Sequence, residues 1–260
     1  MLAVIPCIAF TQDGLDEMIA AEKSFAAYSV VNNTKDAFLE FMDTSAVMFE
    51  NGEPFKSYER WMKKKKTQGV LNWWPLYAEI SNSGDFGYTC GPWTFQPKTV
   101  NDTVVASGYF FTVWKKNEDG MWKFILDVGT EAGPIVKDTG IIKVNTPKTK
   151  GTEESLLLAE QEFIELSRGD LNQLYLKFLR GNSVLCKEGE GLIWMKLPWH
   201  LAPRILNNSH YTIKGNALAP SGDIGYVYGI VTNETEKDTY LRIWRHTSKG
   251  WKLALQLTRL

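Results

Sequence analysis

The stretch SGDFGYTCG at residues 83–91 returns as SGDIGYVYG at residues 221–229, 138 residues further along the chain. The same spacing relates AEKSF at residues 21–25 to AEQEF at residues 159–163. A repeat of this length corresponds to a whole domain, because solenoid repeats are much shorter. The sequence therefore predicts two related domains within one chain.

Helical patterns come first in each copy and strand patterns follow. Met18, Ile19 and Phe25 recur at helical spacing, whereas the segment after residue 76 contains apolar runs bounded by turn residues. In the first copy the expected helices are residues 16–31, a second helix that Thr34 caps, and residues 58–66. In the second copy they are residues 156–166, 171–179 and 194–201. The expected strands are 47–49, 76–81, 86–96, 104–116, 122–128, 183–186, 211–217, 225–232, 239–246 and 251–258. Helices followed by antiparallel strands indicate an α+β fold.

The expected boundaries are a first domain at residues 13–130, a linker at 131–152 and a second domain at 153–260. The linker segment is rich in Gly, Pro, Lys and Thr, and Ile141 to Val144 could pair along a sheet edge. In each domain about three N-terminal helices would pack on one face of a curved antiparallel sheet.

Charge and cysteine content exclude several classes of function. Lys and Arg number 29 and Asp and Glu number 30, so there is no net field to recruit nucleic acid. Cys90 and Cys186 fall in expected strands and are predicted to be small buried hydrophobes. No Cys and His residues have the spacing of a zinc site, so we expect neither a metal nor a cofactor.

The apolar segment at residues 2–10 is too short to span a bilayer, so no membrane span is expected. Residues 9–13 resemble the end of a secretory signal, which makes a periplasmic or secreted protein one expectation and a cytoplasmic protein the alternative.

Six segments together resemble the SnoaL-like and ketosteroid-isomerase-like clan, which has the cone-shaped nuclear-transport-factor-2-like (NTF2-like) fold. They are AEKSF at 21–25, FLEF at 38–41, VMF at 47–49, GDFGYTCGPW at 84–93, VWKK at 113–116 and GMWKFILDVG at 120–129. The closest likeness is to a large uncharacterised branch of the clan. Its members commonly dimerise through the outer faces of their sheets, so the resemblance implies that the two copies form an intramolecular pseudo-dimer and that the protein is a monomer.

The resemblance also implies where chemistry would occur, because clan enzymes place an Asp or His inside the cone. Asp127 on the last strand of the first domain is the candidate base, with Tyr88 or Trp93 as a donor. Strict alternation would place Trp122, Phe124, Leu126 and Val128 toward the helices and Asp127 on the opposite face, which favours a structural role for Asp127. Its counterpart in the second domain, Gln256, could not act as a base.

Aromatic residues are numerous, with 10 Trp, 10 Tyr and 13 Phe, and such side chains fill cores but also line pockets for apolar ligands. The candidate ligand-binding residues are Trp61, Trp74, Tyr88, Trp93, Trp199, His200 and Tyr226.

Three functions remain open on the sequence. The leading hypothesis is a protein that binds a small apolar or aromatic molecule. The first alternative is an isomerase- or dehydratase-type enzyme that uses an acid or base in the first cone. The second is a non-catalytic module for protein interaction, through the linker or the lysines at residues 63–66.

Overall fold

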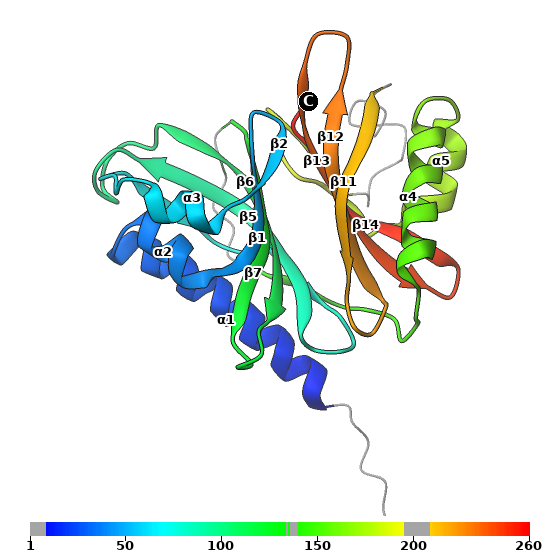
Figure 1. The fold of residues 1–260 in the computed structure, drawn as a ribbon, viewed down its shortest axis with the longest axis horizontal. Helices are drawn as coiled ribbons and strands as arrows, with labels where there is room; N and C mark the ends of the chain where they lie inside the picture. The colour runs from blue at the N-terminus through cyan, green and yellow to red at the C-terminus, as the bar shows by residue number, and fades with distance from the viewer. Residues whose placement is uncertain (1–8, 134, 136–139, 195–208) are drawn as a thin grey trace, which may run out of the picture.

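The structure, a computed structural model, describes residues 9–133, 135, 140–194 and 209–260. Its helices and strands form two successive groups, which we call unit 1 and unit 2 (Figure 1). Unit 1 comprises α1 (Ala9–Val31), α2 (Thr34–Phe41), β1 (Met42–Glu50), β2 (Glu53–Lys56), α3 (Tyr58–Lys63), β3 (Val70–Trp73), β4 (Tyr77–Ile80), β5 (Phe86–Gln96), β6 (Ala106–Lys116) and β7 (Trp122–Glu131). Unit 2 comprises α4 (Glu153–Ser167), α5 (Leu171–Phe178), β9 (Val184–Lys187), β10 (Ile193–Trp194), β11 (His210–Leu218), β12 (Ile224–Thr232), β13 (Lys237–Thr247) and β14 (Gly250–Thr258).

The sheets of the two units have the same strand order. In unit 1 it is β2-β1-β7-β6-β5-β4, with β3 also paired to β5, and in unit 2 it is β10-β9-β14-β13-β12-β11. In each sheet one pair of neighbouring strands is parallel, β1 with β7 in unit 1 and β9 with β14 in unit 2. The remaining pairs between these ordered strands are antiparallel. The helices precede the long strands in both units, which confirms the predicted α+β class.

One short strand, β8 (Ile142–Asn145), lies between the units in sequence. It pairs in parallel with β4 and extends the unit 1 sheet, as the apolar pattern at residues 141–144 predicted. The segment expected to be a linker is therefore partly held by the first sheet.

The two sheets pack face to face and the helices cover their outer faces, as Figure 1 shows. The shared core contains Phe86, Phe111 and Leu126 from unit 1 together with Tyr226 and Leu255 from unit 2. Cys90 and Cys186 also lie in this core as fully buried free thiols, which confirms their predicted role as small hydrophobes.

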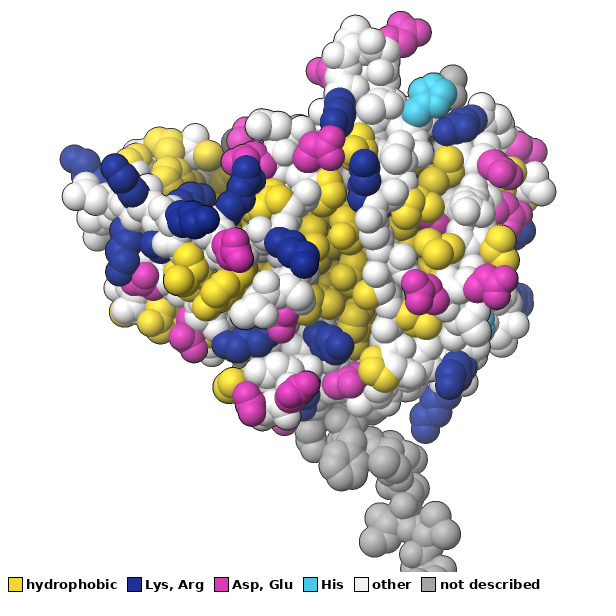
Figure 2. All heavy atoms as spheres, viewed as in Figure 1, with side chains coloured by type: hydrophobic (Ala, Val, Ile, Leu, Met, Phe, Trp, Pro, Cys, Tyr) yellow, Lys and Arg dark blue, Asp and Glu magenta, His cyan; other side chains and the backbone are white. Residues whose placement is uncertain are grey.

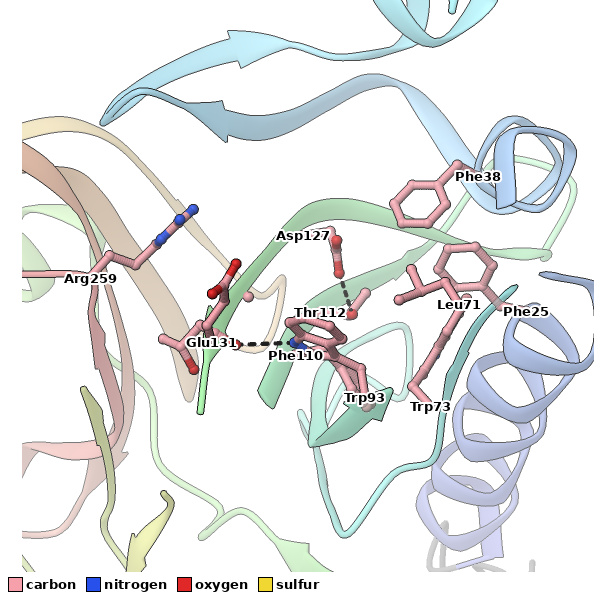
Figure 3. Close-up of a pocket in the computed structure, with 12 residues that line it drawn as sticks. Phe25, Phe38, Leu71, Trp73, Trp93, Phe110, Thr112, Asp127, Glu131 and Arg259 are labelled. Carbon is pink, nitrogen blue, oxygen red and sulfur yellow. Dashed lines mark hydrogen bonds between the residues drawn. The ribbon is translucent and has the colours of Figure 1, made fainter. Parts of the chain in front are cut away.

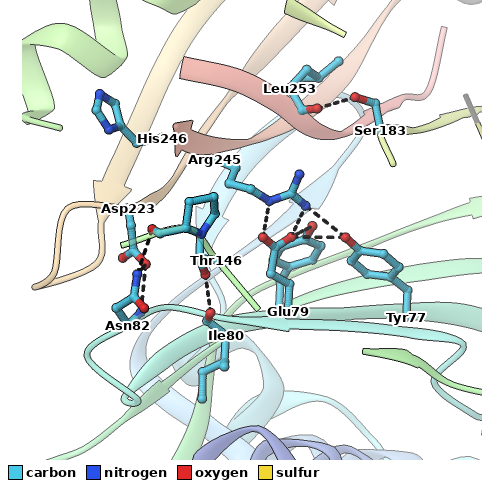
Figure 4. Close-up of polar contacts among 12 residues, drawn as sticks. Tyr77, Glu79, Ile80, Asn82, Thr146, Ser183, Asp223, Arg245, His246 and Leu253 are labelled. Carbon is cyan, nitrogen blue, oxygen red and sulfur yellow. Dashed lines mark hydrogen bonds and ion pairs between the residues drawn. The ribbon is translucent and has the colours of Figure 1, made fainter. Parts of the chain in front are cut away.

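A buried polar network joins the two units inside this apolar core. The Arg245 guanidinium from β13 forms an ion pair with the Glu79 carboxylate from β4, and its Nη2 donates to the Tyr77 hydroxyl at 3.0 Å (Figure 4). Tyr88 donates its hydroxyl hydrogen to Glu79 at 2.6 Å. Nearby, the Asn82 backbone N–H donates to the Asp223 carboxylate at 2.8 Å. Because a buried charge requires a partner, this network fixes how the sheets meet.

A β-bulge interrupts the pairing of β6 and β7. Val113 lies opposite Leu126 and Trp114 lies opposite Phe124, so Ile125 is an extra residue without a partner in β6. An inserted residue reverses which face the following side chains point to.

The expected alternation along β7 was therefore wrong after Phe124. Phe124 packs beneath the helices, but Leu126 and Val128 belong to the core between the two sheets. The Asp127 side chain consequently points to the interior of unit 1, on the side of the helices.

Two local predictions also need correction. Thr34 was expected to cap α2, but the N-cap is Asn33, whose side-chain oxygen accepts a hydrogen bond from the Asp36 N–H at 2.9 Å. Trp194 was expected to begin a helix and instead ends strand β10. The remainder of that expected helix lies outside the described residues. Within the residues that the structure describes, no helix is long and apolar enough to cross a membrane.

Candidate functional site

A cavity of about 280 Å³ lies inside unit 1, between the sheet and the helices α1 and α2 (Figure 3). We call it the unit 1 cavity. Its apolar wall consists of Phe25, Phe38, Leu71, Trp73, Trp93 and Phe110. The rings pack edge to face, with centroids 4.6 Å apart for Phe25 and Trp73 and 6.4 Å apart for Trp73 and Phe110. Such a wall suits a small ligand that carries a ring.

Asp127 places a carboxyl group on this otherwise apolar wall, as Figure 3 shows. The Thr112 hydroxyl, opposite it on β6, donates a hydrogen bond to Oδ1 at 2.7 Å. Removal from water raises the pKa of Asp127 to about 7, and the nearby Glu22 adds to this increase while the Thr112 hydrogen bond opposes it. The group can therefore exchange a proton near neutral pH.

Glu22 on α1 is a fully buried carboxyl group behind the cavity wall. It accepts hydrogen bonds from Trp73 Nε1 at 2.5 Å, from the Thr89 hydroxyl at 2.5 Å and from Trp114 Nε1 at 2.9 Å. Burial raises the pKa of Glu22, although these three donors lower it. We conclude that Glu22 orients Trp73, a wall residue, and holds Trp114 behind it.

The mouth of the cavity contains residues from both units. Glu131 ends β7, and Arg259 follows the last strand of unit 2. Arg259 Nε lies 3.4 Å from Glu188 Oε2 and 3.8 Å from Asp238 Oδ1. Arg259 is thus paired with two carboxylates, and Glu131 places a third carboxylate at the entrance.

No family model matches the sequence, and no curated protein matches it either. Solved structures do match, including proteins described as candidate ketosteroid isomerases and as NTF2-like, each over less than half of the chain. Over that part, the chain is similar to NTF2-like proteins.

Three of these structures illustrate the similarity. An NTF2-like protein of unknown function from Shewanella oneidensis has 17% identity and a TM-score of 0.32, over 45% of this chain and 97% of that one. An NTF2-like protein from Cytophaga hutchinsonii has 16% identity and a TM-score of 0.33, over 45% and 96%. A protein from Catenulispora acidiphila in complex with S-DNPA has 10% identity and a TM-score of 0.35, over 45% and 91%.

Of the residues singled out from the sequence, Trp93 and Asp127 line the unit 1 cavity. Trp93 donates its Nε1 hydrogen to the Thr130 carbonyl at 3.1 Å, so its indole is fixed at the wall. Trp61 stacks on Phe38 with ring centroids 4.1 Å apart and supports the wall from behind.

The other predicted ligand-binding residues lie elsewhere. Tyr88 and Tyr226 are in the core between the two sheets, and Trp74 lies before β4 and does not line the cavity. Trp199 and His200 fall outside the described residues.

Sequence reasoning missed most of the wall. Phe25, Phe38 and Phe110 looked like ordinary core residues, because aromatic residues at helix and strand spacing usually fill a core. Trp73 was among the aromatic residues that the sequence placed around the open end of the cone, and it does line the cavity. Thr112 was missed because only the pairing of β6 with β7 places it beside Asp127.

A wider hollow of about 790 Å³ opens at the surface where the two sheets meet. Figure 2 shows apolar side chains exposed along this junction. Its lining is mixed, from Phe86 and Tyr226 to Lys115 and Asp119, and none of the carboxyl groups in this lining is buried. Among the described residues, no cluster of His, Cys, Asp or Glu could hold a metal ion.

Proposed function

We propose that the unit 1 cavity binds a small molecule with an apolar, ring-shaped body. The observation that carries this proposal is the ring-lined cavity of about 280 Å³ with a single carboxyl group on its inner wall. An apolar wall gives affinity by removing ligand surface from water, and one polar group fixes the orientation of the ligand.

The proposal is tested by a thermal-shift screen of soluble ring compounds, neutral, cationic and anionic, at saturating concentration. We expect some of them to raise the melting temperature, because a ligand that binds only the folded state stabilises it. Leu71→Trp, which fills the cavity, should abolish the shift. Leu158→Trp, on the exposed surface of unit 2, should leave it unchanged. No shift with any compound, or an equal shift in Leu71→Trp, would refute the proposal.

Proton transfer is a second candidate function, favoured by the position of Asp127 in the cavity and its pKa of about 7. The donors first considered are already engaged, since Tyr88 donates to Glu79 and Trp93 to Thr130. A proton-transfer enzyme would therefore use Asp127 alone, as a base that removes and returns a proton.

Deuterium exchange tests this second function. A cyclic ketone such as 2-tetralone is incubated with the protein in D₂O, and loss of its α-proton signal is followed by NMR. A base at Asp127 should accelerate the exchange, and Asp127→Asn should return it to the uncatalysed rate. Equal rates for the two proteins would leave binding as the function and exclude proton transfer from this ketone.

A further inference from the structure

Unit 2 contains a buried cation at the place that corresponds to the unit 1 cavity. The Arg242 side chain is fully buried, and its guanidinium carbon lies 4.4 Å from the ring centre of Phe163, 4.2 Å from that of Tyr211 and 4.7 Å from that of Tyr240. Its Nη1 pairs with the Glu160 carboxylate at 2.5 Å, and its Nε donates to Gln256 at 2.7 Å. Aromatic faces and a carboxylate together offset the cost of burying the charge.

The same cage exists in unit 1 without its cation. The repeat relates Phe163 to Phe25, Tyr211 to Trp73 and Tyr240 to Phe110, and these three residues of unit 1 line the cavity. It also relates the buried carboxylate of Glu160 to that of Glu22.

Arg242 itself corresponds to Thr112, and the pairing of strands supports this correspondence. Thr112 lies opposite Asp127 in the β6–β7 pair, as Arg242 lies opposite Gln256 in the β13–β14 pair. A shorter side chain in unit 1 thus leaves open the space that the guanidinium group fills in unit 2.

The unit 1 cavity also has its own carboxyl group for a cation. Glu22 already accepts three hydrogen bonds, but Asp127 stands where unit 2 has the neutral Gln256. Thr112 donates to Asp127 Oδ1, while Oδ2 accepts no hydrogen bond from the described residues. A charged N–H donor in the cavity would provide that bond and favour the ionised carboxylate.

The entrance to the cavity carries negative side chains, like the Asp127 carboxylate inside it. Arg259 at the mouth pairs with Glu188 and Asp238, and Glu131 stands at the same mouth with its backbone N–H on Glu188. These three carboxylates outnumber the one guanidinium group among them, which favours the approach of a cation.

We propose that the unit 1 cavity takes an organic cation, an amine or guanidinium group on an apolar or ring-shaped body. This rests on the proposed binding function and specifies the class of ligand. Unit 2 shows with its own Arg242 which kind of group this aromatic cage holds, and unit 1 offers the cage to a separate molecule.

Calorimetric titration at pH 8 tests the inference with four probes of similar size: phenylguanidinium, benzylammonium, benzyl alcohol and benzoate. We expect the two cations to bind about tenfold or more tightly than benzyl alcohol, since they gain both cation–π contacts and a charged pair. Benzoate should bind more weakly than the alcohol, because its negative charge is repelled by the negative charge of Asp127. The isosteric variant Asp127→Asn should reduce cation binding to about the level of the alcohol, whereas Leu158→Trp on the exposed surface of unit 2 should leave binding of all four probes unchanged.

A second variant copies unit 2. Thr112→Arg should place a guanidinium group in the unit 1 cage and abolish binding of all four probes, whereas Glu131→Gln at the mouth should weaken the cations only slightly. If benzyl alcohol or benzoate binds wild-type protein as tightly as the cations do, the inference is wrong and small-molecule binding stands. If none of the probes binds, and the screen of ring compounds also gives no shift, both proposals fail.

Discussion

At the scale of single residues, two exchanges separate the interiors of the units. Thr112 stands where unit 2 has Arg242, and Asp127 stands where it has Gln256. The first exchange opens a cavity and the second gives its wall a charge that can be titrated. Phe25, Trp73 and Phe110 have aromatic counterparts in unit 2, whereas Trp93 is replaced by Val231. The interiors therefore differ at a few positions within the same strand order.

The raised pKa of Asp127 predicts a pH dependence of stability. The folded protein holds the proton with a pKa of about 7, against 3.8 for the free side chain, so it binds more protons than the unfolded chain between these values. Stability should fall as the pH rises from 4 to 7, by about 2 kcal/mol once water in the cavity is allowed for, and stay level above. Urea unfolding across this range measures it.

Asp127→Asn should make this slope shallower, because an amide does not titrate in this range and can still accept the Thr112 hydrogen bond. The remaining slope would come from Glu22, whose pKa burial also raises. Glu131→Gln, at the exposed mouth, serves as the matched control and should keep the slope. Parallel pH profiles for Asp127→Asn and wild-type protein would contradict the assignment.

At the scale of elements, the bulge at Ile125 decides which face of β7 carries the carboxyl group. The β13–β14 pair has the same irregularity, since Ile243 lies opposite Leu255 and Trp244 opposite Leu253. The device therefore recurs in both units. It separates each strand into a part that packs under the helices and a part that packs between the sheets.

Deletion of Ile125 tests whether it is the extra residue of the bulge. Without it, Leu126 follows Phe124 directly, so regular pairing keeps Leu126 opposite Val113 and Asp127 opposite Thr112. We expect Asp127 to stay on the side of the helices and the loss to be about 1 to 2 kcal/mol, from the missing Ile125 side chain. Deletion of Thr103, in the exposed loop before β6, is the control and should cost much less. Thermal unfolding followed by circular dichroism compares the two, and a complete loss of the fold without Ile125 would contradict its assignment as the extra residue.

The repeat and the periodicities were enough to predict the α+β class, most elements and the burial of Cys90 and Cys186. The site was not predictable in the same way. A bulge arises from the pairing of two strands, so the run Phe124-Ile125-Leu126 does not reveal which residue is the extra one. For the same reason, the sequence did not reveal that Thr112 lies opposite Asp127.

At the scale of the whole molecule, the units are joined by an apolar core that contains one buried ion pair, Glu79 with Arg245. Desolvation of both groups makes such a pair a weak source of stability, but each group depends strongly on the other. A second pair between the units, Glu53 with Lys237, is exposed and should contribute little. The two pairs therefore separate the effect of burial from that of charge.

Arg245→Met should cost about 3 to 5 kcal/mol, because it leaves the Glu79 carboxylate buried with only tyrosine hydroxyl groups as partners. Adding Glu79→Gln should recover part of this loss, since the uncompensated charge disappears. Lys237→Met, the exposed counterpart, should cost less than about 1 kcal/mol. Urea unfolding of the single and double variants gives the coupling energy directly. If the double variant loses as much as the two single variants together, the pair is not coupled. The position of the sheets would then depend on apolar packing alone.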